Sequence, residues 1–156
     1  MKKALLLIVA FLSLTSCKQI YDTQQEAYNQ KMFSDIPVYY GNFEGLETLE
    51  DITPWINSRV TYKETDRVLS PEECIIRGQC DCDGYALLWM NIAYVQFGIE
   101  CDLILVKDES RKIEAGGTIN HALVRLPNGT QIAPQNGEKR NYTVRYSYHF
   151  DEVFNK

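Results

Sequence analysis

The hydrophobic periodicity changes once along this chain, near Gly98, and that change restricts the fold more than any other feature. Before it, apolar residues recur every three or four positions, which is typical of amphipathic helices. After it, "CDLILVK" and "NHALVRL" are continuous or alternating apolar runs, which indicate strands. Helices followed by strands predict an α+β fold in which N-terminal helices pack on an antiparallel β-sheet.

The first half of the chain contains three expected helices. In "LETLEDITPWINSRV", Pro54 interrupts the apolar spacing, so we expect a new start there with Thr53 as N-cap. In "SPEECIIRG", Ser70 and Glu73 make a capping box and a glycine ends the helix. The third helix runs from about 82 to 97 and is expected to bury one face, formed by Tyr85, Leu88, Ile92 and Val95.

Further strands are expected after the two apolar runs. "PNGT" contains an Asn-Gly pair, which predicts a hairpin turn into "QIA". "YTVRYSYHF" alternates like another strand, and a short helix is expected in "DEVFNK". These elements would complete the antiparallel sheet.

The first residues have the pattern of a bacterial export signal: two lysines, an apolar run, then small and polar residues. The run ends at Leu12, so it is shorter than the ~20 residues that span a bilayer. "LTSC" resembles the lipobox of bacterial lipoproteins, which implies cleavage before Cys17, acylation of that cysteine with palmitate or a similar chain, and a place in the cell envelope. We therefore expect a signal peptide over 1–16, a polar tether over 17–32 and one domain over 33–156.

The charge balance argues against nucleic acid as a partner. The sequence has 16 Lys and Arg against 21 Asp and Glu, and loss of Lys2 and Lys3 with the leader leaves 14 against 21, a net charge of about −7. No basic stripe appears in the sequence.

The segment "GQCDCDGYALLW" brings thiols to the start of the third helix. The free amides and the dipole of a helix N-terminus stabilise a thiolate in the first turn, where Cys82 is expected. Asp81 and Asp83 oppose a thiolate by charge repulsion unless they turn away to cap amides. A cationic partner is therefore needed.

Only two histidines could supply that cation. His149 lies in the tyrosine-rich tail and is expected to be a packing or edge-strand residue. His121 begins the "HALVRL" strand after "EAGGTIN", whose paired glycines let the backbone bend near a site. His121 is therefore the candidate.

The residues also resemble a known superfamily. The frame C-x-x-Y-A, formed by Cys82, Tyr85 and Ala86, is followed by a helix ending in "FGIE", a strand, a loop and "HALV" before a hairpin. This order is similar to that of the transglutaminase-like superfamily, and "CDCDGYALL" resembles its bacterial cysteine proteinases. The resemblance covers about 49–136. It implies a papain-like core, with Cys82 as nucleophile and His121 as the base that takes its proton.

Two details of that resemblance stay open. Cys80 is a rival nucleophile, although counting from it puts Asp83 at the tyrosine position. The family's third residue is an aspartate before a proline, and Ala133 stands there instead. Alanine cannot orient an imidazole, so either Gln131 or Gln135 is a candidate substitute.

The resemblance implies a membrane-anchored cysteine peptidase or amidase, in which a thiolate attacks a peptide or glutamine amide and water, or an amine, resolves the thioester. No cofactor and no metal are expected, the partner is a peptide or protein substrate, and the chain is expected to be a monomer. The alternative is a catalytically degenerate domain that binds a peptide or protein at the envelope.

The remaining thiols are Cys74, Cys80 and Cys101, which allow at most one disulfide. A bridge between Cys80 and Cys101 and a buried free Cys101 are both compatible with the sequence. A metal site made from Cys74, Cys80, Cys82 and His121 lacks the spacing of structural zinc sites and is disfavoured.

Overall fold

The structure is a computed structural model that describes residues 22–108 and 121–156, and the chain divides into two compact units, 1–32 and 33–156. In the first unit, residues 22–32 form a helix within the expected tether, where Gln25 Nε2 donates to Asn29 Oδ1 at 3.0 Å. Glutamine, glutamate and lysine have high helix propensity, so this segment can be helical although it lacks an apolar face. The expected signal peptide and Cys17 lie outside the described residues. Among the described helices, none has the length and apolar character needed to cross a bilayer.

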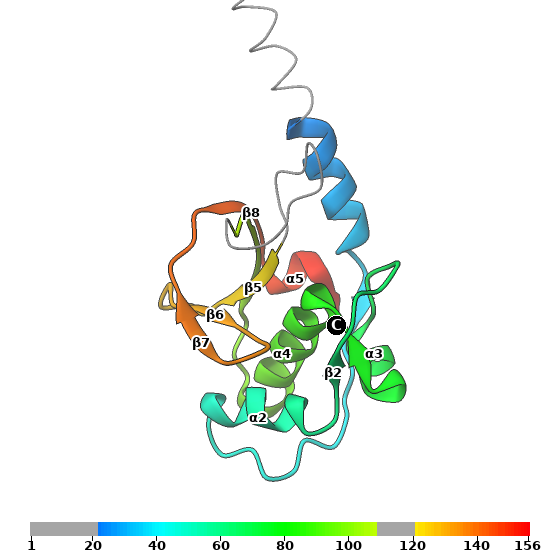
Figure 1. Ribbon diagram of the computed structural model, residues 1–156, viewed down its shortest axis with the longest axis vertical. Helices are drawn as coiled ribbons and strands as arrows, with labels where there is room; N and C mark the ends of the chain where they lie inside the picture. Colours follow the sequence, from blue (N-terminus) through cyan, green and yellow to red (C-terminus); the bar gives the residue numbers. More distant parts are fainter. Residues whose placement is uncertain (1–21, 109–120) are drawn as a thin grey trace, which may run out of the picture. The chain divides into compact units, whose positions relative to one another are not determined.

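The second unit is an α+β domain built on a five-stranded antiparallel sheet, as the change in periodicity predicts (Figure 1). The strand order is β7-β6-β5-β4-β8, so the last long strand returns to pair with β4 instead of extending the hairpin edge. The strands are β4 (Asp102–Val106), β5 (His121–Arg125), β6 (Gln131–Ala133), β7 (Glu138–Arg140) and β8 (Val144–Tyr148).

The helices precede the sheet in the chain, apart from one short turn at the end. They are η1 (Leu49–Asp51), α2 (Ile52–Asn57), α3 (Pro71–Arg77), α4 (Cys82–Phe97) and α5 (Phe150–Val153). The starts and ends predicted for α3 and α4 are confirmed, with left-handed glycines at Gly78 and Gly98. Glycine ends a helix in this way because it lacks the Cβ that would clash at positive φ.

The predicted N-cap of the first helix is wrong. Helical structure begins before Thr53, with η1 leading directly into α2. The backbone N–H of Thr48 donates to Asp51 Oδ2 at 2.8 Å, which fixes an earlier start. Pro54 is tolerated because it is the third residue of α2, where a backbone N–H has no partner within the helix.

Burial of α4 is wider than the predicted single face. Every residue from Gly84 to Ala93 is buried. The helix packs against β5 on the sheet, and α2 and α3 pack against it as well. A helix that is covered on several sides is apolar around nearly its whole circumference. Its hydrophobic pattern therefore shows where the helix begins and ends but does not single out one buried face.

Two short parallel strand pairs were not predicted from the sequence. β1 (Ile36–Pro37) pairs with β9 (Phe154–Asn155), and β2 (Thr61–Tyr62) pairs with β3 (Gln79–Cys80). Two residues are too few to show a period of two. The second pair holds Cys80 just before α4.

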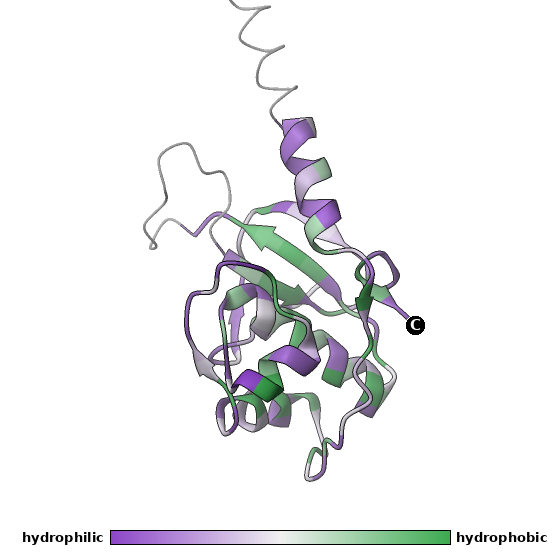
Figure 2. Ribbon diagram, turned by 90° about the vertical axis from the view of Figure 1, so that its right-hand side faces the viewer, coloured by the Kyte–Doolittle hydropathy of each residue, from purple (hydrophilic) through white to green (hydrophobic). Residues whose placement is uncertain are grey.

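Both faces of the central strands are covered, and Figure 2 shows hydrophobic residues along them. One face carries Leu105, Ala122, Val124 and Ile132, by register. The other face carries His121 and the hydrophobic cluster Ile104, Val106, Leu123 and Ala133, against which Tyr142 and Val144 pack.

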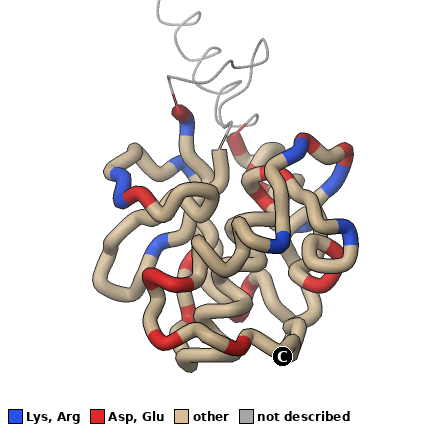
Figure 3. Tube along the Cα trace, turned by 60° about the horizontal axis from the view of Figure 1, so that its bottom comes forward, with Lys and Arg blue, Asp and Glu red and all other residues tan. Residues whose placement is uncertain are grey.

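Acidic and basic residues are interspersed along the described chain (Figure 3). Most of the ion pairs lie at the surface, such as Lys156 with Glu100. The least exposed pair joins Arg125 to Asp102 across β4 and β5, at 2.6 Å. Charges of both signs are therefore mixed over the part of the chain that the structure describes.

Candidate active site

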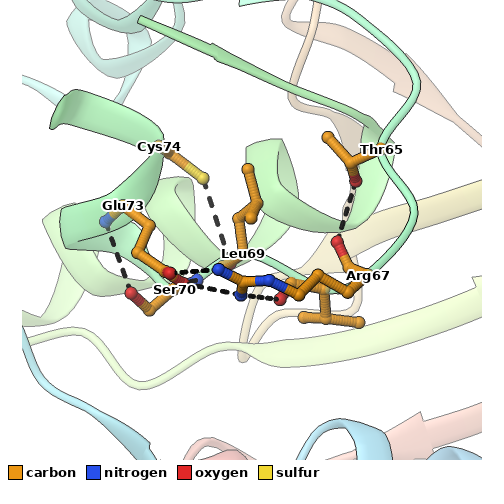
Figure 4. Close-up of polar contacts among 7 residues, drawn as sticks. Thr65, Arg67, Leu69, Ser70, Glu73 and Cys74 are labelled. Carbon is orange, nitrogen blue, oxygen red and sulfur yellow. Dashed lines mark hydrogen bonds and ion pairs between the residues drawn. The ribbon is translucent and has the colours of Figure 1, made fainter. Parts of the chain in front are cut away.

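The start of α3 is fixed by side-chain caps (Figure 4). Ser70 Oγ accepts from the backbone N–H of Glu73 at 3.3 Å, and Glu73 Oε2 accepts from the backbone N–H of Ser70 at 3.0 Å. Arg67 also donates to the Glu73 carboxylate. The hydrogen bond from Arg67, with that from Ser70, lowers the pKa of Glu73 to about 2.

Asp81 caps the start of α4. Its Oδ1 accepts from the backbone N–H of Gly84 at 3.2 Å, and its other oxygen accepts from the hydroxyl of Thr65. The carboxylate thus compensates free amides of the first turn. Of the two aspartates beside the thiols, Asp81 therefore adopts the capping role that the sequence left open.

Cys82 is the first residue of α4 and is partly exposed. Its Sγ donates to Asp83 Oδ1 at 3.6 Å. Burial raises the pKa of Asp83 to about 6, with a further contribution from the nearby Asp81 and an opposing one from the Cys82 hydrogen bond. The Asp83 carboxyl is therefore part protonated near neutral pH, which weakens its repulsion of a thiolate.

Cys80 is less suited to attack a substrate. It is fully buried in β3, whereas Cys82 is partly exposed. A hydrogen bond with the Cys74 thiol, followed by burial, raises the pKa of Cys80 far above the ordinary range for a thiol. A thiol held neutral and away from solvent is inert, so the described geometry favours Cys82 among these two.

His121 is the first residue of β5 and is 6% exposed. It stands opposite Val106, at the end of the sheet where β4 finishes. Because α4 leads through residues 98–101 into the start of β4 and packs on β5, its C-terminal end lies at the other end of β4. The topology therefore directs the first turn of α4 toward the end of the sheet where β4 finishes and β5 begins (Figure 1).

His149 is neither the packing residue nor the edge-strand residue that the sequence predicts, because it follows β8 as the N-cap of α5. Its side chain is 74% exposed, and its Nδ1 lies 2.6 Å from Asp102 Oδ1. The same carboxylate accepts two hydrogen bonds from Arg125. His149 thus belongs to a surface network at the Asp102 end of β4, far along the strand from His121.

Of the two glutamines proposed to replace the missing aspartate, Gln131 has another role in the structure. Gln131 shares the sheet face of His121 and Ala133, but both polar atoms of its side chain bind the backbone of Tyr142: Nε2 donates to the carbonyl at 3.1 Å and Oε1 accepts from the N–H at 2.8 Å. The backbone carbonyl of Gln135 accepts from Asn57 of α2 at 2.9 Å. Gln131 is therefore wrong as an orienting residue, and Gln135 lies beside α2.

Sequence reasoning missed a buried carboxylate just beyond the end of β4. Asp108 is 6% exposed and lies two residues after Val106, the register partner of His121. The hydroxyl of Tyr142 donates to Asp108 Oδ2 at 3.2 Å. The signal was present in "CDLILVKD": on a strand, Asp108 would share the face of Val106 and His121.

A cavity of about 520 Å³ lies between α2, α4 and the β5–β6 hairpin. Trp89 of α4 and Ile132 of β6 line it, together with Leu49, Thr53 and Lys139. Trp89 lies seven residues, or about 10 Å of helix, beyond Cys82.

The described residues contain no group of three or more His, Cys, Asp and Glu side chains that could hold a metal ion. No protein-family model matches this sequence, and a search of curated proteins finds no match. The arguments for function therefore come from the residues themselves.

Proposed function

We propose that this chain is a membrane-anchored cysteine peptidase or amidase of transglutaminase-like type, with a papain-like core. Cys82 is the nucleophile, and His121 takes its proton. The thiolate attacks the carbonyl carbon of a peptide or glutamine amide, the amine leaves with a proton from the imidazole, and water or an amine then releases the acyl group from the thioester.

The observation that carries this proposal is the difference among the thiols at one helix start. Cys82 lies at the N-terminus of a 16-residue helix and is partly exposed, while Cys74 and Cys80 are buried. A helix N-terminus stabilises negative charge on that sulfur and offers amides to an oxyanion. The chain path also brings His121 to the same end of the layer.

The test is the pH dependence of Cys82 alkylation in the full chain. Iodoacetamide labelling, followed by trypsin and mass spectrometry of peptide 78–107, reports Cys82 separately by fragmentation. At pH 7 we expect labelling about tenfold faster than for a free cysteine. His121→Gln should remove that advantage, whereas the matched control His149→Gln should retain it.

Hydrolysis is measured with a quenched fluorescent peptide library and a glutamine-amide release assay. Cys82→Ser should lower turnover by at least about 10³-fold, because the hydroxyl ionises far less readily. Labelling of Cys82 no faster than free cysteine, with no turnover in either assay, would contradict the peptidase proposal.

A second candidate is a degenerate domain that binds a peptide or protein at the envelope. By strand alternation, His121 belongs to the face of Ile104 and Ala133, whereas Ile132, which shares a cavity with Trp89 of α4, belongs to the other face. The imidazole must therefore reach Cys82 around the start of β5. An inert Cys82 together with peptide binding that Trp89→Phe or Thr53→Val weakens would favour this candidate.

The envelope location is a separate part of the proposal and rests on the leader sequence. Cys17→Ser should move the chain from the membrane fraction to the soluble fraction and abolish incorporation of radiolabelled palmitate. Cys101→Ser is the matched control and should leave both unchanged. Membrane association that survives Cys17→Ser would contradict lipid anchoring.

A further inference from the structure

Two thiols outside the proposed active site lie against each other in the core. A Cβ placed on Gly84 would lie 2.9 Å from Cys74 Sγ and 3.1 Å from Cys80 Sγ. Both sulfurs therefore face the same point on the first turn of α4, where glycine leaves room for them. Cys74 and Cys80 are each 0% exposed.

The hydrogen bonds of the pair agree with this placement. The Cys74 thiol donates to the carbonyl of Leu69 at 3.9 Å (Figure 4). The Cys80 thiol hydrogen-bonds Cys74, and this contact is the largest cause of its raised pKa. The four described cysteines are all free thiols in this structure, and the Cys101 thiol donates to the carbonyl of Ile99 at 4.0 Å.

We propose that Cys74 and Cys80 are a disulfide-forming pair, joined when the chain folds in the presence of a disulfide oxidant. The two thiols lose two protons and two electrons to form one S–S bond, and the oxidant's disulfide takes them up to become two thiols. With oxidised glutathione as oxidant, two molecules of reduced glutathione are released. Burial of the pair means that the bond forms before α3 and α4 finish packing.

The bridge has two consequences. It ties α3 directly to the strand that enters α4. This bond stabilises the fold because it lowers the conformational entropy of the unfolded chain. It also removes Cys80 as a competing thiol two residues from Cys82, so oxidation leaves Cys82 reduced and available. The pairing does not depend on whether Cys82 is catalytic.

The decisive experiment maps the bond. The full chain is unfolded, refolded with reduced and oxidised glutathione, blocked with N-ethylmaleimide and cut with trypsin and Asp-N. These proteases place Cys74 in peptide 68–77, Cys80 in 78–80, Cys82 in 81–82 and Cys101 in 83–101. The expected product is 68–77 linked to 78–80, with maleimide on the other two peptides.

Two other results would overturn the proposal. One is linkage of 78–80 to 83–101, or of 68–77 to 81–82. The other is maleimide on both Cys74 and Cys80 in chain that has regained its native circular dichroism. Linkage of 78–80 to 83–101, or maleimide on both thiols, leaves the peptidase proposal standing, because that proposal is read from Cys82 alkylation and turnover. Linkage of 68–77 to 81–82 would contradict both proposals, because it consumes the Cys82 thiol.

Thermal unfolding, measured with and without dithiothreitol, tests the same bond in variants whose folding differs from that of the wild type. Dithiothreitol should lower the Tm of the oxidised wild-type chain by about 5–10 °C. Cys101→Ser should show the same drop, and the double variant Cys74→Ala, Cys80→Ala should show none. An equal drop in the double variant would show that another bond is responsible and overturn the assignment.

Discussion

The α3–α4 junction and the start of β5 carry the two halves of the proposed site, and they are held in place by different kinds of interaction. At the junction, the helix caps are local: Ser70 caps the start of α3 and Asp81 caps the start of α4, each through a backbone N–H three residues on. Asp81 also accepts a hydrogen bond from the more distant Thr65. At β5, His121 is placed by its pairing with Val106 of another strand. The strand is one of five whose order brings distant segments together.

This difference determines how each half responds to substitution. A change at the junction alters a cap or a close packing contact and leaves the sheet intact. A change in the sheet acts through partners far away in sequence, such as Gln131 and Tyr142. The following substitutions compare the two halves.

Gly84→Ala should have the largest effect on stability. The added Cβ would lie 2.6 Å from Cys80 Cβ and 2.9 Å from Cys74 Sγ, closer than packed atoms can approach. Overpacking of this kind costs about 3 kcal/mol, more than the helix propensity gained from alanine. Urea unfolding measures the change, with the exposed Gln96→Ala of the same helix as control. A stability equal to wild type would mean that the junction is loosely packed.

Gln131→Met should lower the free energy of unfolding by about 2 kcal/mol, because the backbone N–H and carbonyl of Tyr142 lose their partners. Chemical denaturation measures it, with Gln96→Met as the matched exposed control. If Gln131 instead served His121, the variant would slow Cys82 alkylation without changing stability. That result would reverse the structural role assigned to Gln131.

Asp83→Asn should raise stability at neutral pH by about 1–2 kcal/mol. The pKa of Asp83 is raised to about 6 in the fold, so the folded state binds the proton more tightly than the unfolded state. Stability from this group is fully present below the ordinary pKa and is lost as pH rises through about 6. Unfolding between pH 4 and 8 should therefore show a fall in the wild type that Asp83→Asn removes.

The exposed carboxylate Asp151 of α5 supplies the control for that titration. Asp151→Asn should keep the fall in stability between pH 4 and 6. Asp83→Asn should also speed Cys82 alkylation, because a neutral side chain then lies beside the sulfur. An unchanged pH profile in Asp83→Asn would show that Asp83 is solvated in solution.

Ser70→Ala should have the smallest effect, about 1 kcal/mol, through loss of the α3 cap. The change is local, so the Cys82 labelling rate should stay within about twofold. Thermal unfolding measures the loss, and Ser58→Ala at the end of α2 is the control for removing a surface hydroxyl. If the free energy of unfolding fell by several kcal/mol, core packing would depend on α3 more strongly than its short length suggests.

Much of the fold followed from local patterns, and the site followed in part. The cap and stop signals of α3 and α4, and the alternation in β4, β5 and β8, each act over a few residues, so the sequence displays them directly. The start of α2 was misplaced because Pro54 was weighed alone, without the Thr48–Asp51 contact before it. The family role carried to Gln131 failed because its side chain is bound to a segment eleven residues away.

The sequence by itself determined where α3 and α4 begin and end, that an antiparallel sheet follows, and that Cys82 opens the central helix. Only the tertiary structure decided that β8 lies beside β4, that Asp108 is buried and bonded to Tyr142, and that Cys74 faces the same point on α4 as Cys80. The physical reason is the distance in sequence over which each kind of interaction acts. Caps and periodicity are interactions among near neighbours in the chain, whereas strand order and thiol pairing depend on which distant surfaces bury each other.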